Sequence, residues 1–325
     1  MDKKIRVGIV GYGNLGKGVE LALKQNPDFE LKAIFTRRDV SSFNLDTKMV
    51  CISDVWDYKD KIDVMILCGG SANDLPAQGP MLSAGFNTVD SYDNHGKIPE
   101  YFSKINETAL ASKKVSLISV GWDPGLFSLN RLLSEAVLPQ GKDYTFWGKG
   151  VSQGHSDAIR RIKGVKKGIQ YTVPVKEAIE KVRECENSDL AACDRHKRIC
   201  YVVAEEAEDL GRIEREIKSM PNYFADYDTE VHFISEEEML ENHSKMPHGG
   251  FVIRTGITGN CNKQRMEFSL ALESNPEFTS SILVAYARAV YRLSTEGKSG
   301  AFSVFDIPFA YLSPKTGEEL RKTLL

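Results

Sequence analysis

Residues 5–16 read Ile-Arg-Val-Gly-Ile-Val-Gly-Tyr-Gly-Asn-Leu-Gly, a short β-branched run followed at once by the pattern Gly-x-Gly-x-x-Gly. Apolar residues then recur at helical spacing over residues 15–25, and Asn26-Pro27 ends the helix because proline cannot continue it. A glycine-rich turn that leaves a strand and enters a helix is the context in which this motif binds a dinucleotide.

Each glycine of the motif has a physical role. Gly11 permits the tight turn, Gly13 lets the backbone approach a pyrophosphate, and Gly16 lets the helix pack close to the strand. The free N–H groups at the start of the helix face the phosphates. The alternative is a glycine turn that holds no ligand, and the strand–turn–helix context favours the dinucleotide.

Alternating strands and helices continue to about residue 120. We expect strands at 31–35, 49–52, 63–68, 87–90 and 115–120, and helices at 74–84 and 98–112. Nearly continuous apolar strands separated by helices indicate a parallel sheet covered on both faces. The predicted fold class is therefore α/β, a Rossmann doubly wound parallel sheet, with a second α+β domain after it.

The second half has a different pattern. Several of its strands alternate polar and apolar residues, as expected for a sheet with one solvated face. Strands are expected at 168–173, 198–204, 230–234, 251–255 and 266–272, and helices at 175–185, 208–219 and 277–295. We predict a nucleotide-binding domain over 1–125, an α+β substrate-binding and dimerisation domain over 126–295, and a segment over 296–325 that returns to the nucleotide domain.

The composition of the chain argues against several classes of protein. The chain has 325 residues, 42% of them hydrophobic, and a net charge of -3, which argues against a nucleic-acid partner. No apolar run approaches the ~20 residues of a membrane span, and no signal sequence is recognisable, so we expect a cytoplasmic protein. Six cysteines without a Cys-x-x-Cys pair predict free thiols. His243 and His248 have no third ligand at a usual spacing, so no metal site is expected.

The end of the second strand distinguishes the two nicotinamide cofactors. NAD enzymes place an acidic residue about 20 residues beyond the glycines, where it binds the ribose 2′-hydroxyl. This chain has Thr36, Arg37 and Arg38 there. Two guanidinium groups and a hydroxyl bind a 2′-phosphate, which a carboxylate would repel, so NADP is expected. Asp39 would have to point away, and a solvated charge pair at a strand end is the alternative.

Three loops follow strands of the predicted sheet, where ligands of doubly wound folds bind. They are Cys68–Ser71, Asp90–His95 and Gly121–Gly125. Asp93 and Asp123, with Trp122, suit an ammonium-bearing substrate beside a nicotinamide. Asp123 is equally placed to cap the next helix.

The second half adds residues that are individually unremarkable. These are Phe146–Gly148, Ser152–Asp157, Thr172, Arg198 and Met246–Gly250. Arg198 can be a surface residue or a carboxylate clamp, and His248 a plain loop residue or a ligand contact. The residues alone predict an NADP oxidoreductase that acts on an amino acid.

Taken together, the segments GYGNLG, TRR, VDSYDNH, GWDPG, SQGHSDA, HKR and MPHGG resemble the meso-diaminopimelate D-dehydrogenase family, from residue 5 to about residue 313. That resemblance implies a cytosolic bacterial homodimer. It also implies the reversible NADP-dependent oxidative deamination of the D-centre of meso-2,6-diaminopimelate to L-2-amino-6-oxopimelate (tetrahydrodipicolinate) and ammonia, which serves lysine biosynthesis in the reductive direction.

The resemblance also implies site residues, with Asp93 and Asp123 as the catalytic pair. Cofactor contacts are implied for Gly11, Tyr12, Gly13, Asn14, Leu15, Gly16, Thr36, Arg37, Arg38, Cys68, Gly69, Gly70, Ser71, Ser91, Tyr92, Asp93, Val120, Gly121, Trp122, Asp123 and Pro124. Substrate contacts are implied for Asp93, Trp122, Asp123, Trp147, Gln153, Gly154, His155, Ser156, Asp157, Thr172, Arg198, His248 and Asn275. The alternatives are another NADP-dependent Rossmann oxidoreductase of amino-acid metabolism, of the dihydrodipicolinate or homoserine type, and a non-catalytic NADP sensor.

Overall fold

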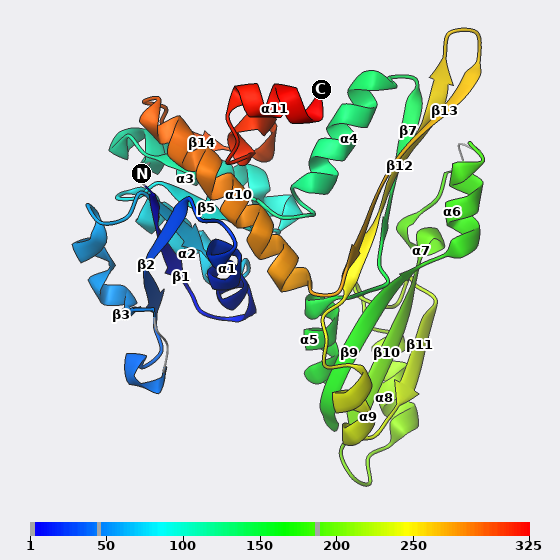
Figure 1. Cartoon of the computed structure of the whole chain (residues 1–325). Coiled ribbons are helices and arrows are strands. Elements are labelled where there is room, and N and C mark those ends of the chain that lie inside the picture. Colours follow the sequence, from blue (N-terminus) through cyan, green and yellow to red (C-terminus); the bar gives the residue numbers. More distant parts are fainter. Residues whose placement is uncertain (1–3, 44–46, 186–188) are drawn as a thin grey trace. The chain divides into compact units, whose positions relative to one another are not determined.

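The computed structural model describes residues 4–43, 47–185 and 189–325. The chain forms two compact units. The first unit is the chain up to Leu129 together with Pro276–Leu325, and the second is Asn130–Asn275. Both are shown in Figure 1. No helix of the described residues combines the length and apolarity that crossing a membrane requires.

A seven-stranded sheet forms the centre of the first unit, in the order β14-β6-β5-β4-β1-β2-β3, with all neighbours parallel. Its strands are β1 (Ile5–Val10), β2 (Phe29–Thr36), β3 (Met49–Cys51), β4 (Val64–Leu67), β5 (Thr88–Asp90), β6 (Val115–Leu117) and β14 (Gly300–Phe302). The helices are α1 (Asn14–Lys24), α2 (Leu75–Ser83), α3 (Ile98–Ser112), α10 (Asn275–Thr295) and α11 (Gly317–Leu324), and α4 (Leu126–Val137) spans the boundary between the units. Short 3₁₀ helices lie at Val40–Ser42, Ile52–Tyr58, His95–Lys97, Val304–Asp306 and Phe309–Leu312. The strand order confirms the predicted doubly wound sheet.

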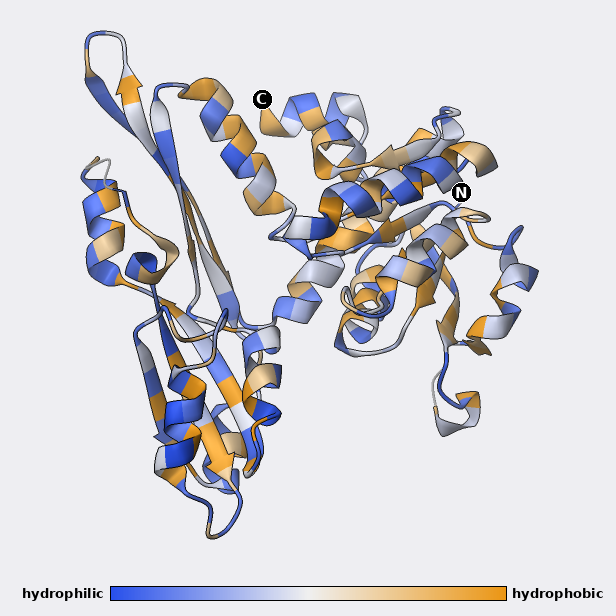
Figure 2. Cartoon of the chain, turned by 180° about the vertical axis from the view of Figure 1, so that it is seen from behind, coloured by the Kyte–Doolittle hydropathy of each residue, from blue (hydrophilic) through white to orange (hydrophobic). Residues whose placement is uncertain are grey.

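The central strands are buried on both faces, as a parallel sheet covered by helices requires. Val7, Ile9, Val64 and Ile66 are 0% exposed, and the strands of this unit are largely orange in Figure 2. Burying such side chains stabilises the fold by roughly 1.5–3 kcal/mol each. The sheet is therefore a rigid base for the loops at its carboxyl edge.

The second unit contains two sheets, one four-stranded in the order β11-β10-β9-β8 and one three-stranded in the order β13-β12-β7. Its strands are β7 (Gly141–Trp147), β8 (Gly150–Val151), β9 (Val165–Pro174), β10 (His196–Ala204), β11 (Thr229–Phe233), β12 (His248–Thr258) and β13 (Asn262–Leu272). Its helices are α5 (Gln153–Arg160), α6 (Lys176–Arg183), α7 (Ala192–Arg195), α8 (Leu210–Lys218) and α9 (Glu236–Asn242). Among the described strands of this unit, only β10 and β11 pair in parallel, so the sheets are mixed and antiparallel, as predicted.

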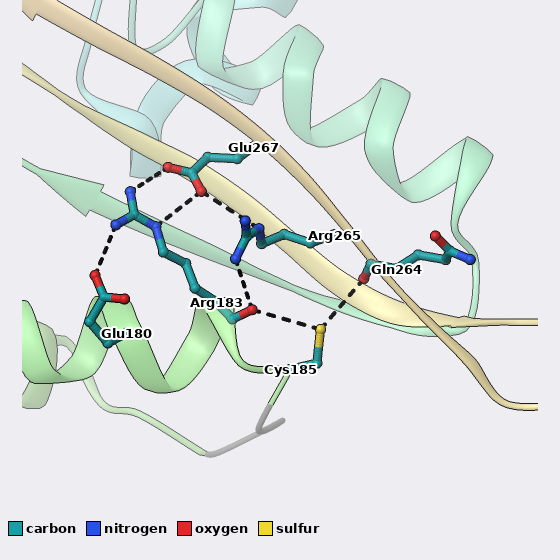
Figure 3. A network of polar contacts seen from close by, with 6 residues as sticks. All are labelled: Glu180, Arg183, Cys185, Gln264, Arg265 and Glu267. Carbon is teal, nitrogen blue, oxygen red and sulfur yellow. Dashed lines mark hydrogen bonds and ion pairs between the residues drawn. The ribbon is translucent and has the colours of Figure 1, made fainter.

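A polar network joins α6 to β13 (Figure 3). The Arg183 guanidinium donates to both carboxylate oxygens of Glu267, at 3.1 and 2.6 Å, and to Glu180 at 2.9 Å. Arg265 donates to the Arg183 carbonyl at 2.9 Å. This fork-shaped pairing fixes the helix across the edge of the three-stranded sheet.

The unit boundaries differ from those expected from the sequence. The helix α10, expected in the second domain, packs in the first unit, where the Ser280 hydroxyl donates to the Leu15 carbonyl at 2.9 Å. The sequence pattern shows the broad apolar face of this helix but not which sheet that face covers. Within the segment over 296–325, Gly300–Phe302 pairs with β6, and a 3₁₀ turn follows at Val304–Asp306.

Candidate active site

The glycine turn forms an open cradle at the start of α1. Gly11 has φ +92°, which favours glycine, and its N–H donates to the Phe35 carbonyl at 2.9 Å. A Cβ at Gly16 would lie 2.1 Å from the Gly11 carbonyl oxygen, so only glycine fits there. A Cβ at Gly13 would meet nothing within 4 Å, and no side chain caps the helix at that residue. Open space in front of uncapped helix N–H groups fits a pyrophosphate.

Positive charge gathers at the end of β2. The buried Thr36 hydroxyl accepts from the Arg38 N–H at 3.1 Å, and the Arg38 guanidinium lies 4.7 Å above the Phe43 ring and donates to the Tyr12 carbonyl. Arg37 has a largely exposed side chain, paired with Asp74 at 2.8 Å. The arrangement fits a ribose 2′-phosphate, and Phe43 and Asp74 are partners that the sequence did not indicate.

Asp39, the nearest carboxylate in the sequence, is turned into its own loop. Its Oδ1 accepts from the Ser41 N–H at 3.0 Å. That backbone hydrogen bond lowers the pKa of Asp39, so the carboxylate is satisfied locally. The expectation that Asp39 points away is consistent with this geometry.

The loops after β4 and β5 are joined directly. The Asp93 N–H donates to the Ser71 hydroxyl at 3.2 Å, and the Gly70 N–H donates to Asp74 at 3.0 Å. Burial raises the pKa of the Cys68 thiol well above its usual range, so this thiol is neutral. The segments Cys68–Ser71 and Ser91–Asp93 thus lie together at the carboxyl edge of the sheet.

The loop after β6 brings Asp123 and Trp122 to the same edge. The Val120 N–H donates to the Asp90 carbonyl at 2.8 Å, so this loop leaves the sheet beside the one that carries Asp93. Trp122 is 7% exposed and packs edge-on against Phe127, with ring centroids 5.2 Å apart. The following helix begins at Leu126, so Asp123 lies three residues before it and is not in the N-cap position.

In the second unit, a buried histidine orients Trp147 at the end of β7. The Trp147 N–H donates to Nε2 of His196 at 2.9 Å, and the two rings stack with centroids 5.3 Å apart. Nδ1 of His196 faces the Ala192 carbonyl at 3.0 Å. Burial lowers the pKa of His196 to about 4, so the ring is neutral and Nε2 accepts. His196 lies in the segment HKR, but the sequence analysis gave a role in the site only to Arg198 of that segment.

The segment over 153–157 lies on α5, and several of its side chains have structural partners. Buried Ser156 donates to the Ser152 carbonyl at 2.6 Å and accepts from the Gln170 N–H at 2.9 Å. His155 faces the Ser152 hydroxyl at 2.8 Å, and burial lowers its pKa to about 4. Asp157 pairs with Arg160 on the same helix. The Gln153 amide donates to the Met246 sulfur at 3.7 Å, and a Cβ at Gly154 would meet nothing within 4 Å.

Thr172 and Arg198 face each other on adjacent strands, since β9 and β10 place them opposite one another. Arg198 is 8% exposed, and its Nη1 donates to the Thr172 hydroxyl at 2.5 Å. Its guanidinium lies 4.0 Å from the Tyr227 ring centroid, and its Nε has no partner among the described residues. Burial lowers the pKa of Arg198, but an arginine stays protonated. The site is thus a buried cation that forms no ion pair with a carboxylate of the described residues.

His248 is the first residue of β12, and Asn275 is the first residue of α10. The His248 Nδ1 accepts from the Gly249 N–H at 2.8 Å, and the ring covers Gly150, where a Cβ would lie 2.4 Å from it. The Asn275 N–H donates to the Met246 carbonyl at 3.0 Å. Residues 248–250, expected in a loop, are the first residues of β12, so His248 is held on a strand. Within the described residues, no group of three metal-ligating side chains occurs, and all six cysteines are free thiols.

Known proteins resemble this chain over its whole length. The family model for the diaminopimelic acid dehydrogenase C-terminal domain matches residues 121–274. The meso-diaminopimelate D-dehydrogenase of Ureibacillus thermosphaericus is 64% identical over 324 residues, which is 99% of each chain. The solved Corynebacterium glutamicum DAP dehydrogenase in complex with DAP is 46% identical, with a TM-score of 0.93 over 99% of this chain and 100% of that one. An engineered D-amino acid dehydrogenase bound to NADP+ is 44% identical, with a TM-score of 0.88 over the same shares.

Proposed function

The chain belongs to the meso-diaminopimelate D-dehydrogenase family, and from that membership we propose how its residues divide the work of the reaction. The reaction is the reversible, NADP-dependent oxidative deamination of meso-2,6-diaminopimelate at its D-centre, giving L-2-amino-6-oxopimelate and ammonia. In the reductive direction it serves lysine biosynthesis. The enzyme must hold two ends of a nearly symmetric substrate differently, because only one centre reacts.

The glycine turn and the end of β2 hold the cofactor. The open space at Gly13 receives the pyrophosphate, and Thr36, Arg37 and Arg38 bind the 2′-phosphate. When bound, NADP supplies the hydride acceptor. The segments Cys68–Ser71, Ser91–Asp93 and Val120–Pro124 lie along the nicotinamide side of the cofactor.

Asp93 and Asp123 bind the ammonium group of the D-centre. Two carboxylates balance the cation and fix the direction of the carbon–hydrogen bond that is to break, and Trp122 forms an apolar wall beside them. One of the two accepts the proton that the amine must lose before the imine forms and water attacks it. Alignment of this kind lowers the barrier by as much as ~7–11 kcal/mol.

Arg198 binds the distal carboxylate of the L-centre, and its burial is the observation that carries the assignment. A guanidinium that is 8% exposed, with Nε unpartnered, is costly unless an anion joins it. Thr172 holds Nη1, which leaves the rest of the fork available for a carboxylate. His248 and Asn275 assist at this end.

The remaining substrate contacts come from Trp147 and from Gln153 to Asp157. The stack of Trp147 on neutral His196 sets the orientation of its indole ring. Gln153 and Gly154, at the open start of α5, approach the substrate most closely, while His155, Ser156 and Asp157 support the helix through the bonds described above.

Replacing Arg198 by methionine tests the distal assignment. The loss of a charge-assisted hydrogen bond of ~1.5–3 kcal/mol predicts a KM for meso-diaminopimelate raised about 10- to 100-fold. Turnover of a D-amino acid that lacks a distal carboxylate should be unaffected. Arg212→Met removes an arginine from α8, where it forms partly exposed ion pairs with Glu208 and Glu216, and serves as the control. An unchanged KM in the Arg198 variant would refute the assignment.

The helix α4 exposes an apolar face that suits contact with a second copy of the chain. Leu132, Leu133 and Val137 on α4 are 48%, 51% and 61% exposed, and orange and blue residues alternate along this helix in Figure 2. A second copy of the chain covers this apolar face in a homodimer, and measurement of the mass in solution would test this.

The enzyme works in the cytoplasm, where its six thiols stay reduced.

A further inference from the structure

Asp90 is a buried carboxylate to which the reaction described above gives no role. It ends β5 and is 1% exposed, and none of the ion pairs among the described residues includes it. Its Oδ1 accepts from the Tyr92 N–H at 2.9 Å and from the Ser119 N–H at 3.1 Å. Its Oδ2 accepts from the Tyr101 hydroxyl at 2.7 Å. Burying an acidic group among neutral donors is expensive, so the bonds it makes call for an explanation.

The donors belong to three different segments. Tyr92 precedes Asp93 in the loop after β5, and Ser119 lies in the loop after β6 that carries Asp123. A single oxygen atom therefore joins the two loops on which the ammonium-binding carboxylates stand. The third donor, Tyr101, stacks on Tyr92 with ring centroids 4.1 Å apart and anchors the carboxylate to α3.

The backbone at Ser119 shows what this bond holds in place. Its φ is +58°, a conformation that non-glycine residues rarely adopt, and its hydroxyl has no partner in the described structure. The Ser119 N–H bond to Oδ1 thus fixes the chain where it turns from β6 toward Asp123. Burial raises the pKa of Asp90 to about 6, so the group is a carboxylate at neutral pH and accepts from all three donors.

We propose that Asp90 is a positioning residue for hydride transfer, which sets the spacing of Asp93 and Asp123 by tying their loops together through one carboxylate. The proposal rests on the ammonium-binding role given to those two residues above. Asp90 itself touches neither substrate nor cofactor. It acts by keeping the reacting carbon aligned, so its loss should appear in kcat and in the isotope effect rather than in cofactor binding.

Asp90→Ala removes the acceptor and frees both loops. A misplacement of the order of 1 Å costs up to ~10²-fold in rate, and we expect kcat to fall about 30-fold. The deuterium isotope effect with substrate labelled at the D-centre should rise, because hydride transfer becomes more rate-limiting. The Kd for NADP should stay within about threefold, since none of the Asp90 side-chain bonds involves the glycine turn or the end of β2, which hold the phosphates.

Asp90→Asn is the conservative variant, which should retain most of the activity that Asp90→Ala loses. Its amide oxygen still accepts from both loop N–H groups, and its NH₂ faces the Tyr101 hydroxyl, which then accepts. We expect it to keep at least about a third of the wild-type kcat, because only the charge is lost. Tyr101→Phe leaves both loop bonds in place and should behave likewise. If either variant lost as much activity as Asp90→Ala, the bridging role would be overturned.

Thr88→Val is the matched control. Thr88 is buried on the same strand, and its hydroxyl donates at 3.0 Å to Ser116 of β6, so it joins β5 and β6 at their opposite end. It should lower the melting temperature as Asp90→Ala does, while kcat and the isotope effect stay unchanged. Equal losses of kcat in Asp90→Ala and Thr88→Val would show that Asp90 has only a structural role. If the alanine variant does not fold, Asp90→Ser, which keeps a shorter acceptor, replaces it in the same comparison.

Asp93→Asn separates this proposal from the one on which it depends. If Asp93→Asn leaves kcat and KM for meso-diaminopimelate unchanged, the ammonium site itself is wrongly assigned. If Asp93→Asn is impaired while Asp90→Ala matches Thr88→Val, the ammonium site stands and the positioning role of Asp90 fails. Impairment of both, with NADP binding retained, is the result that we expect.

Discussion

Gly13→Ala should abolish most of the NADP affinity without unfolding the protein. An alanine Cβ at this residue meets no atom within 4 Å, and the backbone there is extended, with φ -88°, which alanine adopts freely. The cost to stability is therefore limited to a poorer helix start, at most about 1 kcal/mol. The new methyl group occupies the space through which a pyrophosphate reaches the N–H groups of α1.

The size of the effect follows from the bonds lost. Hydrogen bonds from backbone N–H groups to a charged phosphate contribute about 1.5–3 kcal/mol each, so losing one weakens NADP binding about 10- to 100-fold. Titration of NADPH fluorescence measures the Kd, and thermal unfolding measures stability. Gly16→Ala is the matched contrast, because its Cβ would lie 2.1 Å from the Gly11 carbonyl oxygen. It should destabilise the unit by about 1–3 kcal/mol through overpacking. If Gly13→Ala bound NADPH as tightly as wild type, the cradle would not be the pyrophosphate site.

Two further predictions concern the second unit. Burial holds the pKa of His196 near 4, below the unfolded value of about 6.5, so the unfolded chain binds more protons between these values and stability is lost as pH falls from about 6.5 towards 4. Melting curves should show this decline, and His196→Phe should make it less steep, with the remainder due to His155, whose pKa is lowered in the same way. An equally steep decline in the variant would show that His196 does not contribute. Glu267→Gln weakens the network of Figure 3, and it should lower the free energy of unfolding by no more than about 1 kcal/mol and leave kcat unchanged. Denaturant unfolding and a steady-state assay would check the two values. A large loss of activity would contradict a purely structural role.

The nucleotide-binding half of the fold was predictable because its signals are local. The strand Ile5–Val10, its glycine turn and α1 are adjacent in the sequence, and each element has its own periodicity. The helix over 98–112 matched its expected bounds for the same reason. The sequence did not predict which unit contains α10, because the apolar pattern of a helix does not identify the sheet against which the helix packs.

Candidate site residues could be proposed from the sequence where a motif lies on one segment, whereas contacts between distant segments could not. Arg198 and Thr172 are far apart in the sequence, and only the pairing of β9 with β10 places them face to face. His196 and Asp90 lie within the segments HKR and VDSYDNH, but their roles depend on donors from other elements, which those segments do not reveal. Conversely, His155 and Ser156 looked like ligand contacts in the sequence, but the structure gives their side chains partners within the protein.

The most direct test of the account is the ratio of kcat/KM for NADP to that for NAD, measured with meso-diaminopimelate on the wild-type enzyme. The guanidinium groups of Arg37 and Arg38 at the end of β2 predict that NADP is favoured at least about 100-fold, since charge-assisted bonds to the 2′-phosphate contribute several kcal/mol. A ratio near one, or a preference for NAD, would contradict the account.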